Sequence, residues 1–358
     1  MLRCAVLALV LISPAAARAQ DIPAAEGWAA LEAGDASKAA AIFRDALDRS
    51  PRNGDLHYGA AYAARMLGRT DAAMSSLRQA LDCNPRLVPA LVMQAQLAYE
   101  TADLDLAIRS LEKAVALVPK NARLAKQLDA WRRESAVHGQ LNQQAGVRFN
   151  VLFEGATEKP IADRISKVLE SAYWRVGKTL NAYPSQTLSV ILYSNRQFFD
   201  ITRAPAWAGG GYDGRIRIPV GGALKTPADF DRVVTHEFVH AAIATAAPRG
   251  VPTWVNEGIA TYLDSPNRAW ARRVMREAPI VIPLEQLDGG FGRFDSDVSL
   301  IAYAESVIAA EVLFERLSTN VGVFLQLLDG GQSVADALTT LGVRPEEFTA
   351  AWKSRMGR

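Results

Sequence analysis

The sequence predicts an α+β protein in which an all-α array of helices precedes a small sheet and a helical lobe. Three observations support this prediction. A 34-residue period runs through residues 20–121, β-type runs occupy residues 147–153 and 188–193, and helical periodicity dominates after Pro227. Segregation of helices and strands along a chain is typical of α+β architecture. A length of 358 residues also suits about two domains.

The charge and cysteine content exclude two classes of function. The chain has 40 Lys and Arg residues against 38 Asp and Glu, so it lacks the basic excess of proteins that bind nucleic acid. Two cysteines cannot build a disulfide framework or a metal site with several thiolates. Any metal or imidazole chemistry must use one of only four histidines: His57, His138, His236 and His240.

Residues 1–19 have the pattern of a signal peptide. Arg3 is followed by the apolar run Cys4–Ile12, and Ala17-Arg18-Ala19 fits a small-residue cleavage site. The run is far shorter than the roughly 20 residues that span a bilayer, which argues against a membrane anchor. The sequence therefore predicts an exported protein, periplasmic or secreted. After cleavage it should have no membrane span and, with Cys83 alone remaining, no intrachain disulfide.

The first third of the chain is an internal repeat. Three sets of residues recur at a spacing of 34: Ala39, Ala73 and Ala107; Ala46, Ala80 and Ala114; Pro51, Pro85 and Pro119. Small side chains let paired helices approach closely, and proline ends the second helix of each pair. This pattern resembles the tetratricopeptide repeat (TPR), which implies three stacked repeats over residues 20–121.

The residues after the repeats close the array. The segment from Ala122 to His138 has helical spacing of its apolar residues and predicts a capping helix, within a cap and linker over residues 122–145. TPR arrays usually present a concave groove to a peptide or a partner protein. A scaffold or dimer surface is the alternative, and the sequence leaves both open.

Residues 146–358 form the second predicted domain. Val147–Phe153 and Leu188–Tyr193 are β-type runs, and helical periodicity extends from Pro160 to Leu180 between them. The segment from Tyr212 to Val220 contains an Asp-Gly turn, and its proline places the strand at a sheet edge. The run of glycines at 209–211 lacks the Lys-Ser/Thr of a phosphate-binding loop and predicts a flexible turn.

The stretch from Thr226 onward carries the chemistry. Thr226 and Pro227 predict the capped start of a buried helix. His236 and His240 lie four residues apart on one face of this helix, so both imidazoles can reach a single Zn²⁺. Glu237 lies one position further round, where its carboxylate can accept a proton from metal-bound water. The alternative is a pair of helix histidines satisfied by hydrogen bonds.

A third ligand is predicted beyond a break in the helical pattern. Glu257 stands 17 residues after His240, in a second helical segment that follows Pro248–Pro252. That distance lets the chain turn back and offer a carboxylate. Two histidines and one glutamate are the ligand set of thermolysin-type zinc peptidases, which keep a further position for water.

The two motifs together resemble the gluzincin zinc metallopeptidases of the bacterial peptidase MA-like type. They read His236-Glu237-x-x-His240 and Trp254-x-Asn256-Glu257-Gly258-Ile259-Ala260, within a resemblance that covers about residues 147–320. The resemblance implies a zincin fold in which one Zn²⁺ per chain is held by His236, His240 and Glu257. It also implies that Glu237 is the general base.

The resemblance implies two further roles. Gluzincins hold the substrate backbone at an exposed strand edge, and the best match is the strand Arg215, Ile216, Arg217, Ile218. They also commonly stabilise the oxyanion with a Tyr or His from a later helix. The match is Tyr303, in the apolar helix from Val298 to Leu317, for which a core tyrosine is the alternative.

One feature departs from the family pattern. Some relatives place an acid four residues after the third ligand, where it orients a ligand histidine. That position is Thr261 here. The sequence leaves three acids as loose possibilities for this support: Asp229, Asp231 and Asp264.

The main hypothesis is therefore an exported zinc-dependent metallopeptidase whose TPR repeats bind its peptide substrate or a protein partner. One alternative is a TPR adaptor protein that keeps a structural zinc domain. Glu237 argues against it, because a structural site needs no base beside the metal. Another is a zinc hydrolase that cleaves an amide of the cell envelope. The natural substrate, endo- or exo-cleavage and the oligomeric state are left open.

Overall fold

The computed structural model describes residues 22–357, apart from residue 102, residues 203–208 and residues 221–225. The predicted signal peptide lies outside these described residues. The chain divides between residues 139 and 140 into two compact units. The described helices and strands form an N-terminal helical array and a mixed sheet with a helical lobe, which confirms the predicted α+β class.

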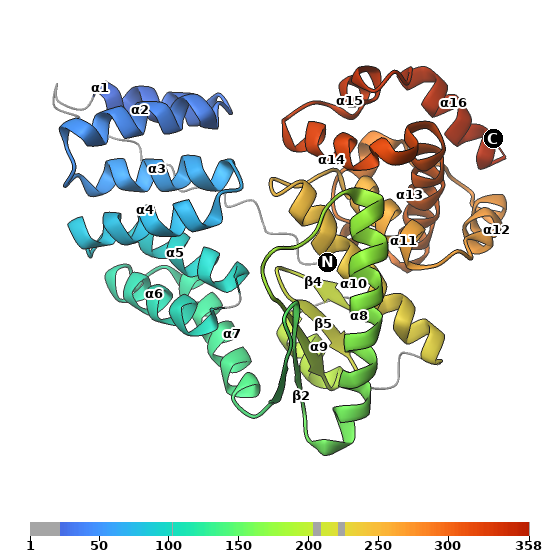
Figure 1. Ribbon diagram of the computed structural model, residues 1–358, viewed down its shortest axis with the longest axis horizontal. Helices are drawn as coiled ribbons and strands as arrows, with labels where there is room; N and C mark the ends of the chain where they lie inside the picture. The colour runs from blue at the N-terminus through green and yellow to red at the C-terminus, as the bar shows by residue number, and fades with distance from the viewer. Residues whose placement is uncertain (1–21, 102, 203–208, 221–225, 358) are drawn as a thin grey trace. The chain divides into compact units, whose positions relative to one another are not determined.

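The described part of the first unit is a stack of helices in sequence order (Figure 1). They are α1 (Ile22–Glu32), α2 (Ala36–Arg49), α3 (Gly54–Met66), α4 (Thr70–Cys83), α5 (Val88–Glu100), α6 (Leu104–Leu117) and α7 (Ala122–His138). The repeated alanines Ala39, Ala73 and Ala107 are fully buried, as close helix contacts require. Gly34 (φ +80°) and Gly68 (φ +68°) are in the left-handed conformation that closes the first two helix pairs.

The capping helix α7 is attached to the third repeat through aromatic and polar contacts. The Tyr99 ring stacks on Trp131 with 4.5 Å between ring centroids, and the Tyr99 hydroxyl donates a 2.7 Å hydrogen bond to Glu134. His57, in α3, donates from Nε2 to the carbonyl oxygen of Pro51 at 2.9 Å. His57 therefore has a structural role within the repeats.

The second unit begins with a five-stranded sheet in the order β1-β2-β3-β5-β4. The strands are β1 (Asn142–Ala145), β2 (Phe149–Phe153), β3 (Leu188–Tyr193), β4 (Gly211–Tyr212) and β5 (Ile216–Pro219). β2, β3 and β5 run parallel, while β1 and β4 are antiparallel to their neighbours. Residues 142–145, assigned to the linker from sequence, instead pair with β2.

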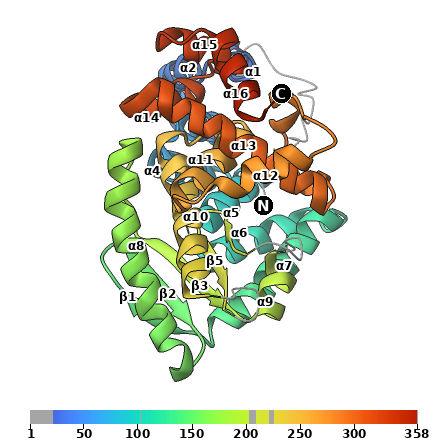
Figure 2. The same ribbon diagram turned by 90° about the vertical axis from the view of Figure 1, so that its right-hand side faces the viewer.

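Helices cover the sheet and build the core of this unit. They are α8 (Lys159–Leu180), α9 (Asn195–Thr202) and α10 (Pro227–Ala246), with the short 3₁₀ helix η1 (Ala156–Glu158). Val151, Val190 and Ile218 point from one sheet face into a core shared with α8 and α10. α9 packs against β3 and β5. Figure 1 and Figure 2 show the strands at one end of the unit and α14–α16 at the other.

The strand predicted to hold the substrate is not at a sheet edge. β5 pairs with β3 on one side and with β4 on the other, and Arg215, Ile216, Arg217 and Ile218 are all at most 2% exposed. Arg217 donates to Asp213 at 3.1 Å and to the Tyr193 hydroxyl at 2.7 Å. The prediction failed because the Asp-Gly turn folds β4 back along β5, and Pro219 is tolerated as the last residue of the strand.

The rest of the second unit is helical. Its helices are α11 (Thr253–Asp264), α12 (Ala269–Glu277), α13 (Ser296–Leu317), α14 (Val321–Asp329), α15 (Val334–Thr340) and α16 (Pro345–Arg355), with the 3₁₀ helices η2 (Leu284–Leu287), η3 (Phe291–Arg293) and η4 (Ser318–Asn320). The long helix α13 contacts α11, α12, α14 and α16. It is therefore the central support of the lobe.

A buried carboxyl group on α13 should make stability depend on pH. Glu305 is fully buried and accepts a 2.8 Å hydrogen bond from the Ile282 amide, while its Oε2 has no partner among the described residues. Burial raises the pKa of Glu305 from 4.5 to about 7, although this hydrogen bond opposes the rise. Between pH 4.5 and about 7, Glu305 therefore keeps a proton in the folded protein that it has already lost in the unfolded chain.

The free energy of unfolding should accordingly fall as pH rises from about 4.5 to 7, by roughly 1–3 kcal/mol from this group. Glu305→Gln keeps the acceptor for Ile282 and removes the charge, so this variant should be more stable than the parent at pH 8 and similar at pH 4. Thermal unfolding of both proteins across this range measures the difference. Parallel pH profiles would show that Glu305 titrates normally.

Candidate metal centre

The first two predicted ligands lie on α10, whose start is capped as expected. The Thr226 hydroxyl accepts a hydrogen bond from the Asp229 amide at 3.1 Å, and Pro227 occupies the first turn. The helix continues unbroken to Ala246. The rings of His236 and His240 lie on one face with centroids 4.7 Å apart.

The third predicted ligand is carried by α11. Glu257 is completely buried, and its Oε2 lies 3.6 Å from Nε2 of His236 and 3.7 Å from Nε2 of His240. Among the described residues, neither oxygen of Glu257 has a hydrogen-bond partner. His236, His240 and Glu257 thus offer three donor atoms within 4.8 Å of one another, an arrangement suited to a metal ion.

Close packing of α11 on α13 holds Glu257 in place. Gly258 allows this approach, because a Cβ atom there would lie 2.3 Å from the carbonyl oxygen of Ser306 and 3.3 Å from Cβ of Ala310. The glycine of the Asn-Glu-Gly motif therefore serves helix packing, directly beside the ligand.

Both candidate ligand histidines are oriented by hydrogen bonds on the side away from Glu257. Nδ1 of His236 donates to Asp264 at 2.9 Å, and Nδ1 of His240 donates to the side-chain oxygen of Asn256 at 3.0 Å. A protonated Nδ1 leaves the lone pair of the neutral ring on Nε2, which is the atom that faces Glu257. The rings are thus set for metal binding through Nε2.

The charges of the site favour a bound cation. Burial alone lowers the pKa of His236, but the hydrogen bond to Asp264 and the nearby carboxylate of Glu257 outweigh it and raise the pKa to about 10. Burial raises the pKa of Glu257, but the positive charges of His240 and His236 reverse the effect and lower it. A buried group of carboxylates that holds a proton this firmly has an excess of negative charge. A divalent cation can take the place of the proton and neutralise that charge.

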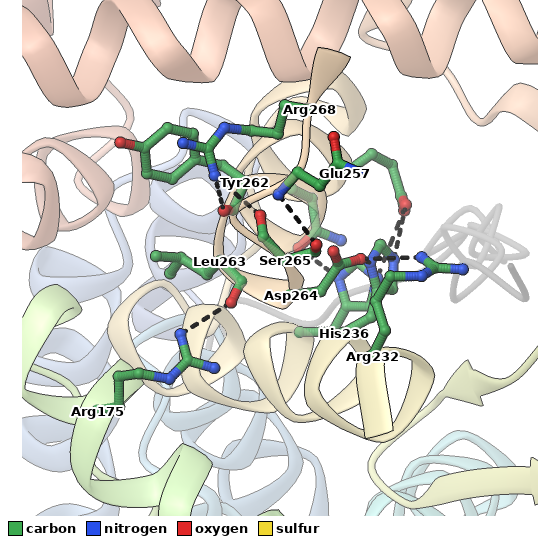
Figure 3. Close-up of polar contacts among 12 residues, drawn as sticks. Arg175, Arg232, His236, Glu257, Tyr262, Leu263, Asp264, Ser265 and Arg268 are labelled. Carbon is green, nitrogen blue, oxygen red and sulfur yellow. Dashed lines mark hydrogen bonds and ion pairs between the residues drawn. The ribbon is translucent and has the colours of Figure 1, made fainter. Parts of the chain in front are cut away.

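Asp264 supplies the acid that is missing at Thr261. It lies at the end of α11, where it accepts hydrogen bonds from His236 and from Arg232, the latter at 3.2 Å (Figure 3). Nearby backbone carbonyls are held by Arg175, which donates to Leu263 at 2.9 Å, and by Arg268, which donates to Tyr262 and Ser265. These arginines donate hydrogen bonds to the free carbonyl oxygens at the C-terminal end of the helix, and so help to fix the position of Asp264.

The other two acids considered for this support are engaged elsewhere. Asp231 forms a bidentate pair with Arg164 of α8 at 2.6 and 2.8 Å. Asp229 accepts a 2.8 Å hydrogen bond from the Thr226 hydroxyl at the start of α10. Of the three possibilities, the structure selects Asp264.

Glu237 and Tyr303 complete the site. Glu237 is 6% exposed, and burial raises its pKa above 4.5, although the charges of His240 and His236 oppose the rise. Burial and then the charges of Glu257 and Glu237 raise the pKa of Tyr303 well above its ordinary value of 10. The Tyr303 ring also packs edge-on against Phe291, with centroids 5.2 Å apart.

Comparison with known families agrees with this geometry. A model of the Peptidase MA superfamily matches residues 170–356, which include every candidate ligand and the candidate base. The chain belongs to the Peptidase MA superfamily. A tetratricopeptide repeat model matches residues 24–87, within the predicted array. No curated protein matches the chain.

The Peptidase MA domain thus brings together His236, Glu237, His240, Glu257 and Tyr303. Sequence reasoning missed the contribution of Asn256, although it stands next to Glu257 in the motif and its amide oxygen is a good acceptor for an imidazole N–H. It also missed the segment at 209–211, which was interpreted as a flexible turn although its Gly210 lies directly against Glu237.

Within the described residues, no helix is both long and apolar enough to cross a bilayer.

Proposed function

We propose that this protein is a zinc-dependent metallopeptidase of the gluzincin type. One observation carries the proposal: the Nε2 atoms of His236 and His240 lie within 3.7 Å of a buried Glu257 oxygen. Two imidazoles and one carboxylate are the ligands that hydrolytic Zn²⁺ sites use, with a further position left for water or substrate. Membership of the Peptidase MA superfamily supports peptide bonds as the target.

Each residue of the site has a defined task in this proposal. Zinc, when bound, would supply a Lewis acid that polarises the scissile carbonyl and lowers the pKa of water. Glu237 takes the proton from the attacking water and passes it to the leaving amine. Its raised pKa suits both steps, because the carboxyl group can hold the proton between them. Asp264 and Asn256 keep the Nδ1 protons of the ligand histidines in place.

Tyr303 is proposed to stabilise the oxyanion. Its raised pKa keeps the phenol protonated, so that it can donate a hydrogen bond to developing negative charge. Tyr303→Phe should lower kcat by about 10²–10³-fold, with little change in KM or melting temperature, because the ring keeps its contact with Phe291. Steady-state kinetics and thermal unfolding measure both effects. Loss of stability with unchanged kcat would assign Tyr303 to the core.

Asp264 should control zinc affinity without being a ligand. Asp264→Ala removes the acceptor of the His236 Nδ1 proton and should weaken zinc binding by about 10–100-fold. Asp231→Ala is the matched control, since it removes an acid of the same unit that pairs with Arg164 instead. Competition with a metal chelator measures both affinities. Equal zinc affinity in the two variants would refute the role of Asp264.

Metal analysis combined with a peptide-library cleavage assay tests the proposed function. We expect about one Zn²⁺ per chain, as a single site of this type holds, and cleavage that stops with a chelator and returns with zinc. Zinc binding without cleavage of any peptide would favour the adaptor with a structural zinc domain. Cleavage of a cell-envelope amide in place of peptides would favour the alternative hydrolase.

We further propose that the TPR repeats bind the substrate or a protein partner, and that the protein is exported. The match to a tetratricopeptide repeat model over residues 24–87 supports the first proposal, since such repeats commonly mediate protein interaction. The pattern of residues 1–19 supports the second. Cell fractionation of the full chain, with a variant lacking residues 2–19 as the control, tests export.

A further inference from the structure

Gly210 lies against the side chain of Glu237. A Cβ atom built on Gly210 would be 2.8 Å from Oε1 of Glu237, 2.9 Å from its Cγ and 3.1 Å from its Cδ. Contacts below 3.0 Å essentially never occur for real Cβ atoms. The space that a side chain at position 210 would need is therefore the space that the Glu237 side chain occupies.

The conformation of Gly210 does not explain why glycine stands here. Its φ lies outside the left-handed region, so φ does not require a glycine at this position. The next residue, Gly211, also has φ outside that region, but a Cβ atom there would meet nothing within 4 Å. A Cβ atom would therefore contact Glu237 at position 210 but not at position 211.

The three atoms nearest to an added methyl group at 210 all belong to the Glu237 side chain. The atoms it meets belong to a flexible side chain, which can give way more easily than main chain. An ordinary contact distance of at least 3.4 Å requires a shift of roughly 0.5 Å or more from the 2.8–2.9 Å positions. Glu237 directly adjoins His236 in sequence and has little free space, since it is 6% exposed.

We propose that Gly210 is a positioning residue for Glu237: its missing side chain leaves the volume in which the carboxylate is held beside His236 and His240. The role of Gly210 in turnover rests on the proposed peptidase function, in which Glu237 is the base. The contact itself does not depend on that function. A misplacement of about 1 Å at a reacting group can cost on the order of 10²-fold in rate, so this contact can govern turnover.

The kinetic test compares Gly210→Ala with Gly211→Ala on a library peptide that the parent cleaves. Gly210→Ala should retain zinc and lower kcat by about 10–100-fold with little change in KM, because the base moves and the ligands do not. Gly211→Ala should behave like the parent. Equal kcat in both variants, beside an active parent, would overturn the role of Gly210 in turnover.

A second measurement tests the contact without using activity. The fall in melting temperature caused by Gly210→Ala is measured in the metal-free protein and again in a Glu237→Ala background. Gly210→Ala should lower the melting temperature more in the parent than in the Glu237→Ala background, because removing the Glu237 side chain removes the clash. Gly211→Ala should change the melting temperature equally in both backgrounds. An equal fall for Gly210→Ala would overturn the contact. If the parent neither binds zinc nor cleaves peptides, the proposed function fails, while this comparison still decides the contact.

Discussion

Glu237→Gln is expected to abolish peptide cleavage while zinc content and melting temperature stay near those of the parent. Glutamine has almost the same shape as glutamate, but its amide cannot take up a proton. Loss of general base catalysis should lower kcat by about 10²–10⁴-fold. Because the Glu237 side chain is not among the metal donor atoms, the ligand set is untouched.

The measurement is kcat on a peptide that the parent cleaves, with zinc quantified in the same samples. Glu285→Gln is a matched control, since Glu285 lies in η2 and is not part of the site. The control should cleave at the parent rate. Cleavage by Glu237→Gln at the parent rate would show that another group accepts the proton. Loss of zinc from this variant would show that Glu237 supports the ligands.

Elements governed by local sequence could be predicted well. The start of α10 follows from Thr226 and Pro227, and the shared face of His236 and His240 follows from the helical period. The repeat columns predicted helix contacts because Ala39 and its equivalents must be small wherever helices meet closely. In each case the interaction that determines the structure joins residues that are close in sequence or that recur at a fixed spacing.

Features that depend on tertiary packing could not be predicted. The partnership of His236 with Asp264 spans 28 residues and requires α11 to fold back beside α10. β1 has the polar sequence Asn-Gln-Gln-Ala and is mostly exposed, so it has no apolar alternation to reveal it. Arg215 and Arg217 read as surface residues of an edge strand, yet both are buried. The edge position inferred from Pro219 was therefore wrong, because β4 pairs with β5 on its outer side.

The double replacement of His236 and His240 with alanine is expected to remove zinc from the protein altogether. Structural zinc sites with four protein ligands contribute roughly 10–16 kcal/mol, or about 3 kcal/mol per ligand, so losing two ligands should weaken binding by about 10⁴-fold. Glu257 alone would remain, and a single carboxylate cannot retain zinc against a chelator. Peptide cleavage should disappear with the metal.

His138→Ala is the control for this experiment, because it also removes a histidine but lies in α7, within the first unit. It should bind one zinc per chain like the parent. Thermal unfolding checks that the double variant still folds, which is a real concern because Asp264 and Glu257 lose the histidines that partner their buried charges. Replacing the same two histidines with asparagine keeps polar groups beside these carboxylates and guards against unfolding. Full zinc retention in either folded double variant would place the metal elsewhere and refute the site.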